Sequence, residues 1–572
     1  MGLSLTELLV EYLRSPLGLD EQAPRFSWQL SSDKKETFQT AAEIRVREGK
    51  TEEEVWDSGQ LSTGVSTGIA YAGKELKPCT SYVVQVEVTD NYGRKAVAET
   101  VFETGFLKKD KSVWEGADWI GAPDFHVAAN ARGVFVLEST FRMKEGSKRA
   151  GVVFGANDFR LLDHNQNEYG LEGENYIRYE INRAGEKPVL DIYRVGYAKD
   201  DKKDVPFATV ELDKNVNFDE FHCLKIVVDG DKAFAYLDEQ PVDVPETAMG
   251  RMKISGRVLN PRGHNDVLTY PRLNEIGFFA GEGDTACFKN LTVKNLRTPG
   301  RTFVEETPEK EASIFAELPK EDGCFVVSGN QITKDPTRGA IPMLRSNIPV
   351  RKDAALQRAR LYMTARGVYD VHVNGARITD NLLAPGLTQY DKRMNYQTYD
   401  LTGILKPGNN GIGVALGSGW WCDAQTFVVK NYNYFGDKEA LLAKIVLEFS
   451  DGDREVYTTN PETWKYFGDG PYRYSGFFLG EQYDARKKGV YDAFSLADFD
   501  DSGWKAAAKE PWELPVIDEC RTFPEGFGRS WPKVHGQEVA FEGGYSAPVQ
   551  VTAVRSARKR LDQGEKVYIY DL

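Results

Sequence analysis

The stretch ARLYMTARGVYDVHVNGARIT (residues 359–379) alternates apolar and polar side chains as far as an Asn374-Gly375 pair. Alternation with a period of two predicts a half-buried strand, and Asn-Gly between two such runs is a strong hairpin signal. The same pattern recurs in TSYVVQVEVTD (80–90) and in VDGDKAFAYLD (228–238), whereas helical periodicity is weak nearly everywhere. The sequence therefore predicts an all-β chain.

Length and composition indicate several soluble domains. The chain has 572 residues, which are too many for one hydrophobic core, so we expect three to five domains. The net charge of −14 argues against a nucleic-acid partner and against docking on anionic lipid. No apolar run approaches the roughly 20 residues that a membrane-spanning helix needs. A neutral ligand such as a glycan fits this charge balance.

The cysteines and histidines give no sign of a metal site. The six cysteines lie far apart without a CxxC spacing, and the six histidines are scattered. A few disulfides are possible, but we expect most cysteines to be buried free thiols. They are Cys79, Cys223, Cys287, Cys324, Cys422 and Cys520.

Several motifs follow one another in a fixed order in the second half of the chain. They are VNG (373–375), LAPGLTQYDKRMNYQTYD (383–400), LGSGWW (416–421), YFGDKEALLAKIVLEFSDG (434–452), GEQYDAR (480–486) and DFDDSGW (498–504). Together they resemble the N-terminal domain of bacterial alpha-L-rhamnosidases of glycoside hydrolase family 78. EYLRSPLGLDEQAPRFSWQL (11–30) is similar to the first domain of the same family.

The resemblance and the strand pattern predict a multidomain chain of β-sandwiches. We expect a fibronectin type III-like sandwich over 3–107 and a concanavalin/laminin G-like jelly roll inserted over 112–298. A polar, acidic, proline-bearing linker over 299–324 precedes a galactose-binding-like rhamnosidase N-terminal sandwich over 325–505. Residues 506–572 read as the start of a further, truncated β-sandwich.

The resemblance implies a parent enzyme that hydrolyses terminal alpha-L-rhamnose with inversion. Such an enzyme needs two carboxyl groups roughly 6.5–9.5 Å apart. In the family they lie on a C-terminal (α/α)6 barrel, and this sequence has no long run of amphipathic helices. We therefore name no catalytic residue and no required cofactor, and we expect the chain alone to be inactive. KVYIYDL (566–572) ends within a strand-like run, which favours truncation.

Trp420 and Trp421 are the first candidates for sugar contact. Gly417 and Gly419 precede them, and an exposed indole could present its apolar face to a sugar ring. The alternative, which we favour, is that both side chains pack at a joint between domains.

Asp391 and the GEQYDAR motif are the other candidates. Asp391 could accept hydrogen bonds from sugar hydroxyls or help to hold a calcium ion, although no DxDxDG-type loop supports calcium. A salt bridge with Arg393 or another basic residue is the favoured alternative. Glu481, Tyr483 and Asp484 form a second polar cluster, either at a domain joint, which we favour, or at the rim of a glycan pocket.

Two classes of function remain open. The chain is either the accessory part of a rhamnosidase, with rhamnose-containing glycans and the C-terminal barrel as partners, or a stand-alone carbohydrate-binding or adhesion protein. Purely structural sandwiches without a ligand are a third possibility. We expect a periplasmic or extracellular location in a bacterium, although the start of the chain is no signal peptide. A cytoplasmic location stays open as an alternative.

Overall fold

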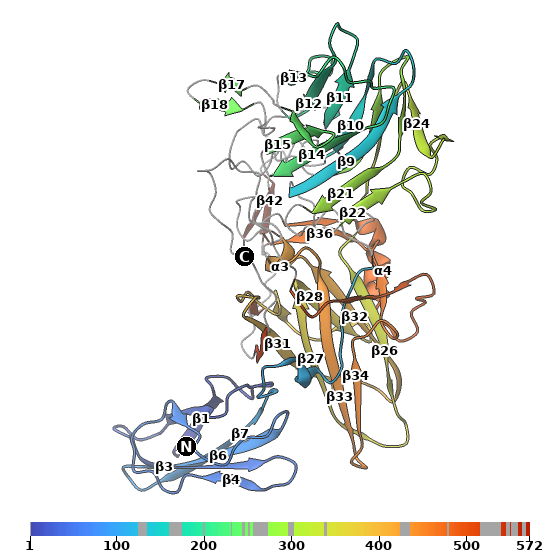
Figure 1. Cartoon of the computed structure of the whole chain (residues 1–572). Coiled ribbons are helices and arrows are strands. Elements are labelled where there is room, and N and C mark those ends of the chain that lie inside the picture. The colour runs from blue at the N-terminus through green and yellow to red at the C-terminus, as the bar shows by residue number, and fades with distance from the viewer. Residues whose placement is uncertain are drawn as a thin grey trace.

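The computed structural model of the chain consists almost entirely of β-strands, which confirms the all-β, multidomain prediction. It contains three β-sandwiches, and the third lies between the first and the second (Figure 1). The residues that the structure describes are 2–123, 134–158, 174–197, 201–229, 232–242, 246–249, 252–255, 273–295, 302–336, 340–423, 435–477, 480–514, 539–544, 549–550, 559–562 and 568–571.

The first sandwich packs a sheet of order β1-β2-β5 against a sheet of order β4-β3-β6-β7. Their bounds are β1 Ser4–Val10, β2 Arg25–Ser31, β3 Gln39–Glu48, β4 Glu54–Asp57, β5 Ile69–Ala70, β6 Ser81–Asp90 and β7 Lys95–Glu103. Strand β6 buries Tyr82, Val84, Val86 and Val88, each at most 1% exposed. The alternation in residues 80–90 therefore predicted both the strand and its buried face.

The second sandwich packs a six-stranded sheet against a nine-stranded one. The six-stranded sheet has the order β13-β12-β11-β10-β19-β25, with β10 Arg149–Ala156, β11 Tyr176–Asn182, β12 Val189–Val195, β13 Ala208–Glu211, β19 Glu275–Ala280 and β25 Gln331–Lys334. The nine-stranded sheet contains β9 Val134–Met143, β14 His222–Asp229, β15 Lys232–Leu237, β16 Gln240–Val242, β20 Thr285–Phe288, β21 Leu291–Asn295, β22 Thr302–Glu306, β23 Lys320–Glu321 and β24 Cys324–Ser328. Between the sheets, Phe278 contacts the rings of Phe288, Phe315 and Phe325. Strands β17 Glu246–Met249 and β18 Met252–Ser255 form a separate hairpin.

The third sandwich also has two sheets. One has the order β29-β28-β32-β26-β35-β38, with β26 Met343–Val350, β28 Val368–Val373, β29 Ala376–Arg377, β32 Gly408–Gly417, β35 Lys465–Phe467 and β38 Lys505–Ala506. The other has the order β39-β8-β33-β27-β31-β40, with β34 beside β33. Its strands are β8 Trp119–Gly121, β27 Leu356–Arg366, β31 Arg393–Asp400, β33 Ala440–Phe449, β34 Arg454–Thr458, β39 Ala508–Glu510 and β40 Ala540–Gly543.

The Asn-Gly hairpin of the third sandwich is confirmed. Val373 pairs with Ala376 across the turn, and Asn374 and Gly375 both have positive φ, at 51° and 84°. Two consecutive positive φ values are what a type I′ turn requires. Two further strand pairs involve C-terminal residues: β30 Asn381–Leu382 with β41 Val549–Gln550, and β42 Lys559–Asp562 with β43 Tyr568–Asp571.

The sheets do not follow the predicted boundaries at 298, 324 and 505. The expected linker contains β22 and β23, and β24 and β25 beyond it also pair with strands of the second sandwich. The segment is polar because it lies at a sheet edge, yet it buries Phe303 and Val304. Strand β8 pairs with β33 and β39, and β40 pairs with β31, so residues 119–121, within the predicted insertion, and residues after 505 complete the third sandwich. Local composition does not reveal these long-range partners.

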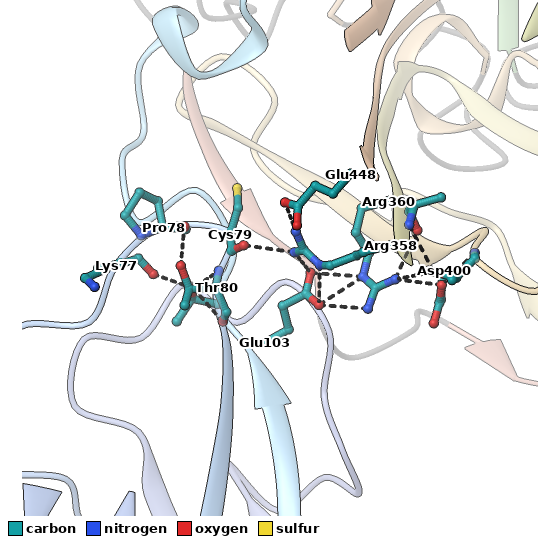
Figure 2. A network of polar contacts seen from close by, with 12 residues as sticks. Lys77, Pro78, Cys79, Thr80, Glu103, Arg358, Arg360, Asp400 and Glu448 are labelled. Carbon is teal, nitrogen blue, oxygen red and sulfur yellow. Dashed lines mark hydrogen bonds and ion pairs between the residues drawn. The ribbon is translucent and has the colours of Figure 1, made fainter. Parts of the chain in front are cut away.

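A buried ion-pair network joins the first sandwich to the third (Figure 2). Glu103, at the end of β7 and 2% exposed, accepts hydrogen bonds from Arg358 Nη2 at 2.5 Å and Arg360 Nε at 2.9 Å. Both arginines belong to β27. The remaining acceptors of the two guanidinium groups include the Cys79 carbonyl, Glu448 and Asp400.

A second contact at the same joint centres on Asp20. Its carboxylate accepts hydrogen bonds from Tyr396 Oη at 2.9 Å and from the Gly543 amide at 2.6 Å. The Tyr396 oxygen in turn accepts from the Phe106 amide at 2.8 Å, and the two rings lie 4.4 Å apart. Burial raises the pKa of Asp20. The first sandwich is therefore held by hydrogen bonds and aromatic packing as well as by ion pairs.

The cysteines of the described residues are free thiols, as expected for most of the six. Cys520 lies outside the described residues. Within the part of the chain that the structure describes, no helix is long and apolar enough to cross a membrane.

Candidate functional site

The LGSGWW motif forms the end of β32 and the short helix α3 (Gly419–Cys422). Gly419 has φ of +52°, and a Cβ at this position would lie 2.8 Å from a Val368 methyl group. A glycine is therefore required both by the backbone conformation and by the close approach of β28. The turn gives the two tryptophans different environments, with Trp420 half-buried and Trp421 only 1% exposed.

Trp421 is a packing residue. Its Nε1 donates to the Lys438 carbonyl at 3.1 Å, and its ring contacts the rings of Tyr390 and Phe435. Gly436 lies against the indole so closely that a Cβ there would be 2.5 Å from it. With 1% of its surface exposed, Trp421 offers no ring face to a sugar, which corrects its assignment as a sugar-binding candidate. Tyr390, Phe435 and Lys438 all belong to the third sandwich, so Trp421 packs in the interior of that sandwich.

Buried carboxylates surround the motif, and the sequence analysis did not single them out. Glu439, 1% exposed, accepts hydrogen bonds from Ser418 Oγ at 2.6 Å and from Cys422 Sγ at 3.4 Å. Burial, with the Glu439 charge next in importance, raises the pKa of the Cys422 thiol well above its ordinary value. Asp423 accepts from Tyr474 Oη at 2.7 Å. The sequence signal for Glu439 is the presence of both motifs, GSGWW and FGDKE, because Glu439 ends the second motif and binds Ser418 of the first.

The segment after Gly436 also connects the second and third sandwiches. Asp437, 1% exposed, accepts a hydrogen bond from Asn295 Nδ2 at 3.0 Å, and Asn295 ends strand β21 of the second sandwich. Three consecutive residues of the FGDKE motif therefore form hydrogen bonds with three different parts of the protein. Asp437 binds the second sandwich, Lys438 binds the Trp421 indole, and Glu439 binds the Ser418 hydroxyl.

Trp420 forms an aromatic pair with Phe477, whose side chain is 48% exposed. The ring centroids lie 4.9 Å apart with an interplanar angle of 38°. Phe477 follows β36 (Tyr472–Gly476), which pairs with β37 (Gly480–Tyr483). The Ser418 amide donates to the Ser475 carbonyl at 3.3 Å and fixes this hairpin to the GSGWW motif. Of the two predicted tryptophans, Trp420 is the one that stands beside exposed surface.

The hairpin carries two further predicted residues. Glu481 is exposed and accepts a hydrogen bond from Ser475 Oγ at 3.3 Å. Tyr483 is 43% exposed and meets the edge of Tyr472 at 4.9 Å. The structure therefore places Glu481 and Tyr483 on the same hairpin that contacts Trp420, and this hairpin lies where the second and third sandwiches adjoin (Figure 1).

Asp484 has a structural role. It caps the 3-10 helix η3 (Ala485–Lys487) by accepting from the Arg486 amide at 3.1 Å, and it pairs with Arg486 Nη2 at 2.7 Å. The Arg486 hydrogen bonds lower the pKa of Asp484 to about 2. A short helix α4 (Lys488–Ala493) follows.

Asp391 lies in the loop whose Tyr390 packs on Trp421, and its side chain is half-buried. Arg393 pairs with Glu542 of β40 at 3.1 Å, and a salt bridge of Asp391 with Arg393 or another basic residue stays a prediction. In the described residues, no three His, Cys, Asp or Glu side chains gather as metal ligands would.

The exposed part of the site combines aromatic and polar side chains. The Trp420–Phe477 pair presents apolar ring surface, and Glu481 and Tyr483 supply polar groups on the adjoining hairpin. Apolar ring faces with a few polar groups are the usual elements of a small-ligand surface.

Comparison with known proteins agrees with this architecture. Residues 5–108 match the Rha78A-like, N-terminal immunoglobulin domain, and residues 354–524 match the alpha-L-rhamnosidase N-terminal domain. An alpha-L-rhamnosidase of Streptomyces avermitilis is 28% identical over 528 residues, which cover 90% of this chain and 45% of that protein. One of Formosa agariphila is 35% identical over 170 residues, covering 29% of this chain and 18% of that protein.

A solved structure shows the same fold. The crystal structure of Streptomyces avermitilis alpha-L-rhamnosidase complexed with L-rhamnose has a TM-score of 0.51 and 23% identity, over 90% of this chain and 47% of that one. The fold and the two matched domains define a multidomain β-sandwich protein with a rhamnosidase N-terminal domain. These matches are consistent with the N-terminal region of an alpha-L-rhamnosidase of glycoside hydrolase family 78. The chain spans less than half the length of these relatives.

Proposed function

We propose that this chain is the N-terminal β-domain portion of an enzyme that removes terminal alpha-L-rhamnose from glycans or glycosides. The observation that carries the proposal is the match to an alpha-L-rhamnosidase across 90% of the chain, together with two rhamnosidase domain matches in the same order. These matches do not favour the alternative of a stand-alone carbohydrate-binding or adhesion protein. The periplasmic or extracellular location stays a prediction.

In this proposal the chemistry belongs to an (α/α)6 barrel that follows these domains. Two carboxyl groups of the barrel, roughly 6.5–9.5 Å apart, would protonate the leaving oxygen and activate a water for inversion. The described domains contribute a scaffold. The buried Glu103 network and the Asp437–Asn295 hydrogen bond support this role, because both tie neighbouring sandwiches together.

The proposal predicts a sharp difference in activity between this chain and the longer protein. The purified chain should not release the aglycone from an aryl alpha-L-rhamnoside, whereas the protein that includes the following module should do so. The measurement is a colorimetric assay on matched molar amounts. Turnover by the chain alone would contradict the proposal that the catalytic groups lie in the following barrel. No turnover by the longer protein on any alpha-L-rhamnoside would contradict the rhamnosidase assignment.

We further propose that Trp420 contacts sugar at the rim of the third sandwich. Titration with L-rhamnose should change the tryptophan fluorescence of the chain, and Trp420→Ala should abolish that change because the half-buried indole at the surface is lost. Trp56→Phe, which alters a half-buried indole of the first sandwich, is the matched control and should retain it. An unchanged response in Trp420→Ala, or no response in the parent chain, would leave Trp420 with a packing role only.

A further inference from the structure

The open side of the third sandwich contains a groove of about 620 Å³ between β26 and β35 of one sheet and β33 and β34 of the other. Binding sites for small ligands commonly have volumes of about 300–1,000 Å³. Its floor is apolar core, and its walls include Asn347, Asn409, Tyr457, Asn460, Thr463 and Trp464. This groove is separate from the Trp420 hairpin, because none of the hairpin residues lines it.

The two charged residues that line the groove form an ion pair. They are Lys465 and Asp501, and their side chains pair at 2.6 Å. Asp501 also pairs with the buried guanidinium of Arg345. A charged ligand would lose water without gaining an opposite charge, which is unfavourable. The lining therefore selects against anions and cations and suits a neutral ligand.

The aromatic and polar groups of the wall are held in fixed positions. Tyr457, half-exposed, has its hydroxyl within hydrogen-bond distance of the Glu455 carboxylate at 2.8 Å and of the Pro349 carbonyl at 2.9 Å, which fixes the ring beside the groove. Asn460 Oδ1 accepts from the amide and hydroxyl of Thr463, both at 2.9 Å. A wall held by such internal hydrogen bonds loses little conformational entropy when a ligand binds.

Two polar groups of the wall are available to a ligand. Within the described residues, Trp464 Nε1 takes part in no hydrogen bond, although the side chain is only 4% exposed. Buried indole N–H groups usually have a partner. Asn347 is exposed, and its side-chain oxygen accepts a hydrogen bond from Arg345 Nη2 at 3.1 Å. The NH₂ group of the same side chain is the donor that it can offer to a ligand.

We propose that this groove binds a short, neutral, polyhydroxylated ligand, that is, an uncharged oligosaccharide. The Tyr457 ring stacks on a sugar face, and the Trp464 N–H and the Asn347 amide donate to hydroxyl or ring oxygens. The site goes beyond the proposed enzymatic function, since it is argued from the groove alone and acts without a catalytic barrel. It would give the third sandwich a glycan-holding role of its own.

The test is calorimetric titration of the full chain with short neutral oligosaccharides, and with uronic-acid oligosaccharides as the charged comparison. Neutral ligands should bind and charged ones should not. Tyr457→Ala should weaken binding by about tenfold or more, as loss of an aromatic anchor does. Trp464→Phe, which keeps a ring and removes the N–H, should weaken it several-fold. Asn347→Ala, at an exposed position, provides a variant with little risk to folding.

A control on another sandwich locates the effect. Tyr92→Ala removes a tyrosine that is 48% exposed on the first sandwich, and it should bind neutral oligosaccharides as the parent does. Circular dichroism establishes that each variant is folded. The proposal is overturned if no neutral oligosaccharide binds, if charged ones bind as well, or if folded Tyr457→Ala and Asn347→Ala retain parental affinity. None of these outcomes depends on rhamnosidase activity, so the two proposals fail separately.

Discussion

Glu103→Ala is expected to lower the free energy of unfolding by about 3 kcal/mol, at the low end of the roughly 3–5 kcal/mol for breaking a buried ion pair. The substitution leaves Arg358 and Arg360 at a joint where their side chains are only 17% and 11% exposed. Each guanidinium keeps one other carboxylate, from Glu448 or Asp400, which is why we choose the low end. The loss should appear as a lower urea concentration at the midpoint of unfolding of the first sandwich.

The matched control for this prediction lies on the same strand. Glu99 is four residues earlier on β7, and its ion pair with Arg47 is at the surface, with a distance of 3.4 Å. Glu99→Ala should change the free energy of unfolding by less than about 0.5 kcal/mol. Glu103→Ala should also speed proteolysis near residue 107, where the first sandwich leaves the joint. If the two variants unfold alike and are cleaved alike, the network does not hold the joint.

Trp421→Ala is expected to lower the free energy of unfolding by about 3–5 kcal/mol, as deletion of a buried aromatic side chain does. The substitution removes the ring between Tyr390 and Phe435 and leaves a cavity that Gly436 has no side chain to fill. It also leaves the Lys438 carbonyl without the indole donor. The measurement is the shift of the thermal unfolding midpoint, with the free energy from denaturant titration.

Its neighbour is the natural control. Trp420 is half-buried against Phe477, so Trp420→Ala should cost only about 1–2 kcal/mol of burial. Trp421→Phe should fall between the two, because it retains ring packing and loses the hydrogen bond. Equal destabilisation by Trp420→Ala and Trp421→Ala would show that the two indoles are not partitioned between surface and core.

Much of the fold could be predicted because its signals are local. The alternation from Tyr82 to Val88 predicted a strand and its buried face, and Asn374-Gly375 predicted a two-residue turn. Pairing between distant segments left no such local signal. Residues 299–324 have a linker's composition yet add β22 and β23 to a sheet, and β8 pairs with strands more than 300 residues later.

The site was predictable in its motifs but not in the environment of each residue. The two tryptophans were treated alike in the sequence, but which of them is buried depends on Gly436 and Lys438, which lie beyond them in the sequence. Glu439 was missed for the same reason, because a single glutamate among many acidic residues has no local mark of burial. Asp484 was named as a candidate because its carboxylate could bind sugar hydroxyls, whereas in the structure that carboxylate accepts hydrogen bonds from Arg486.

Strand β8 has a consequence for how such a protein evolves. Because β8 precedes the second sandwich in the chain and β26 follows it, both flanks of that sandwich return to the same folded body. A module bounded in this way can be gained, lost or exchanged at the level of the gene without cutting through the cores of its neighbours. At the seam, a replacement module would need an amide or hydroxyl that donates to Asp437 in place of the Asn295 side chain.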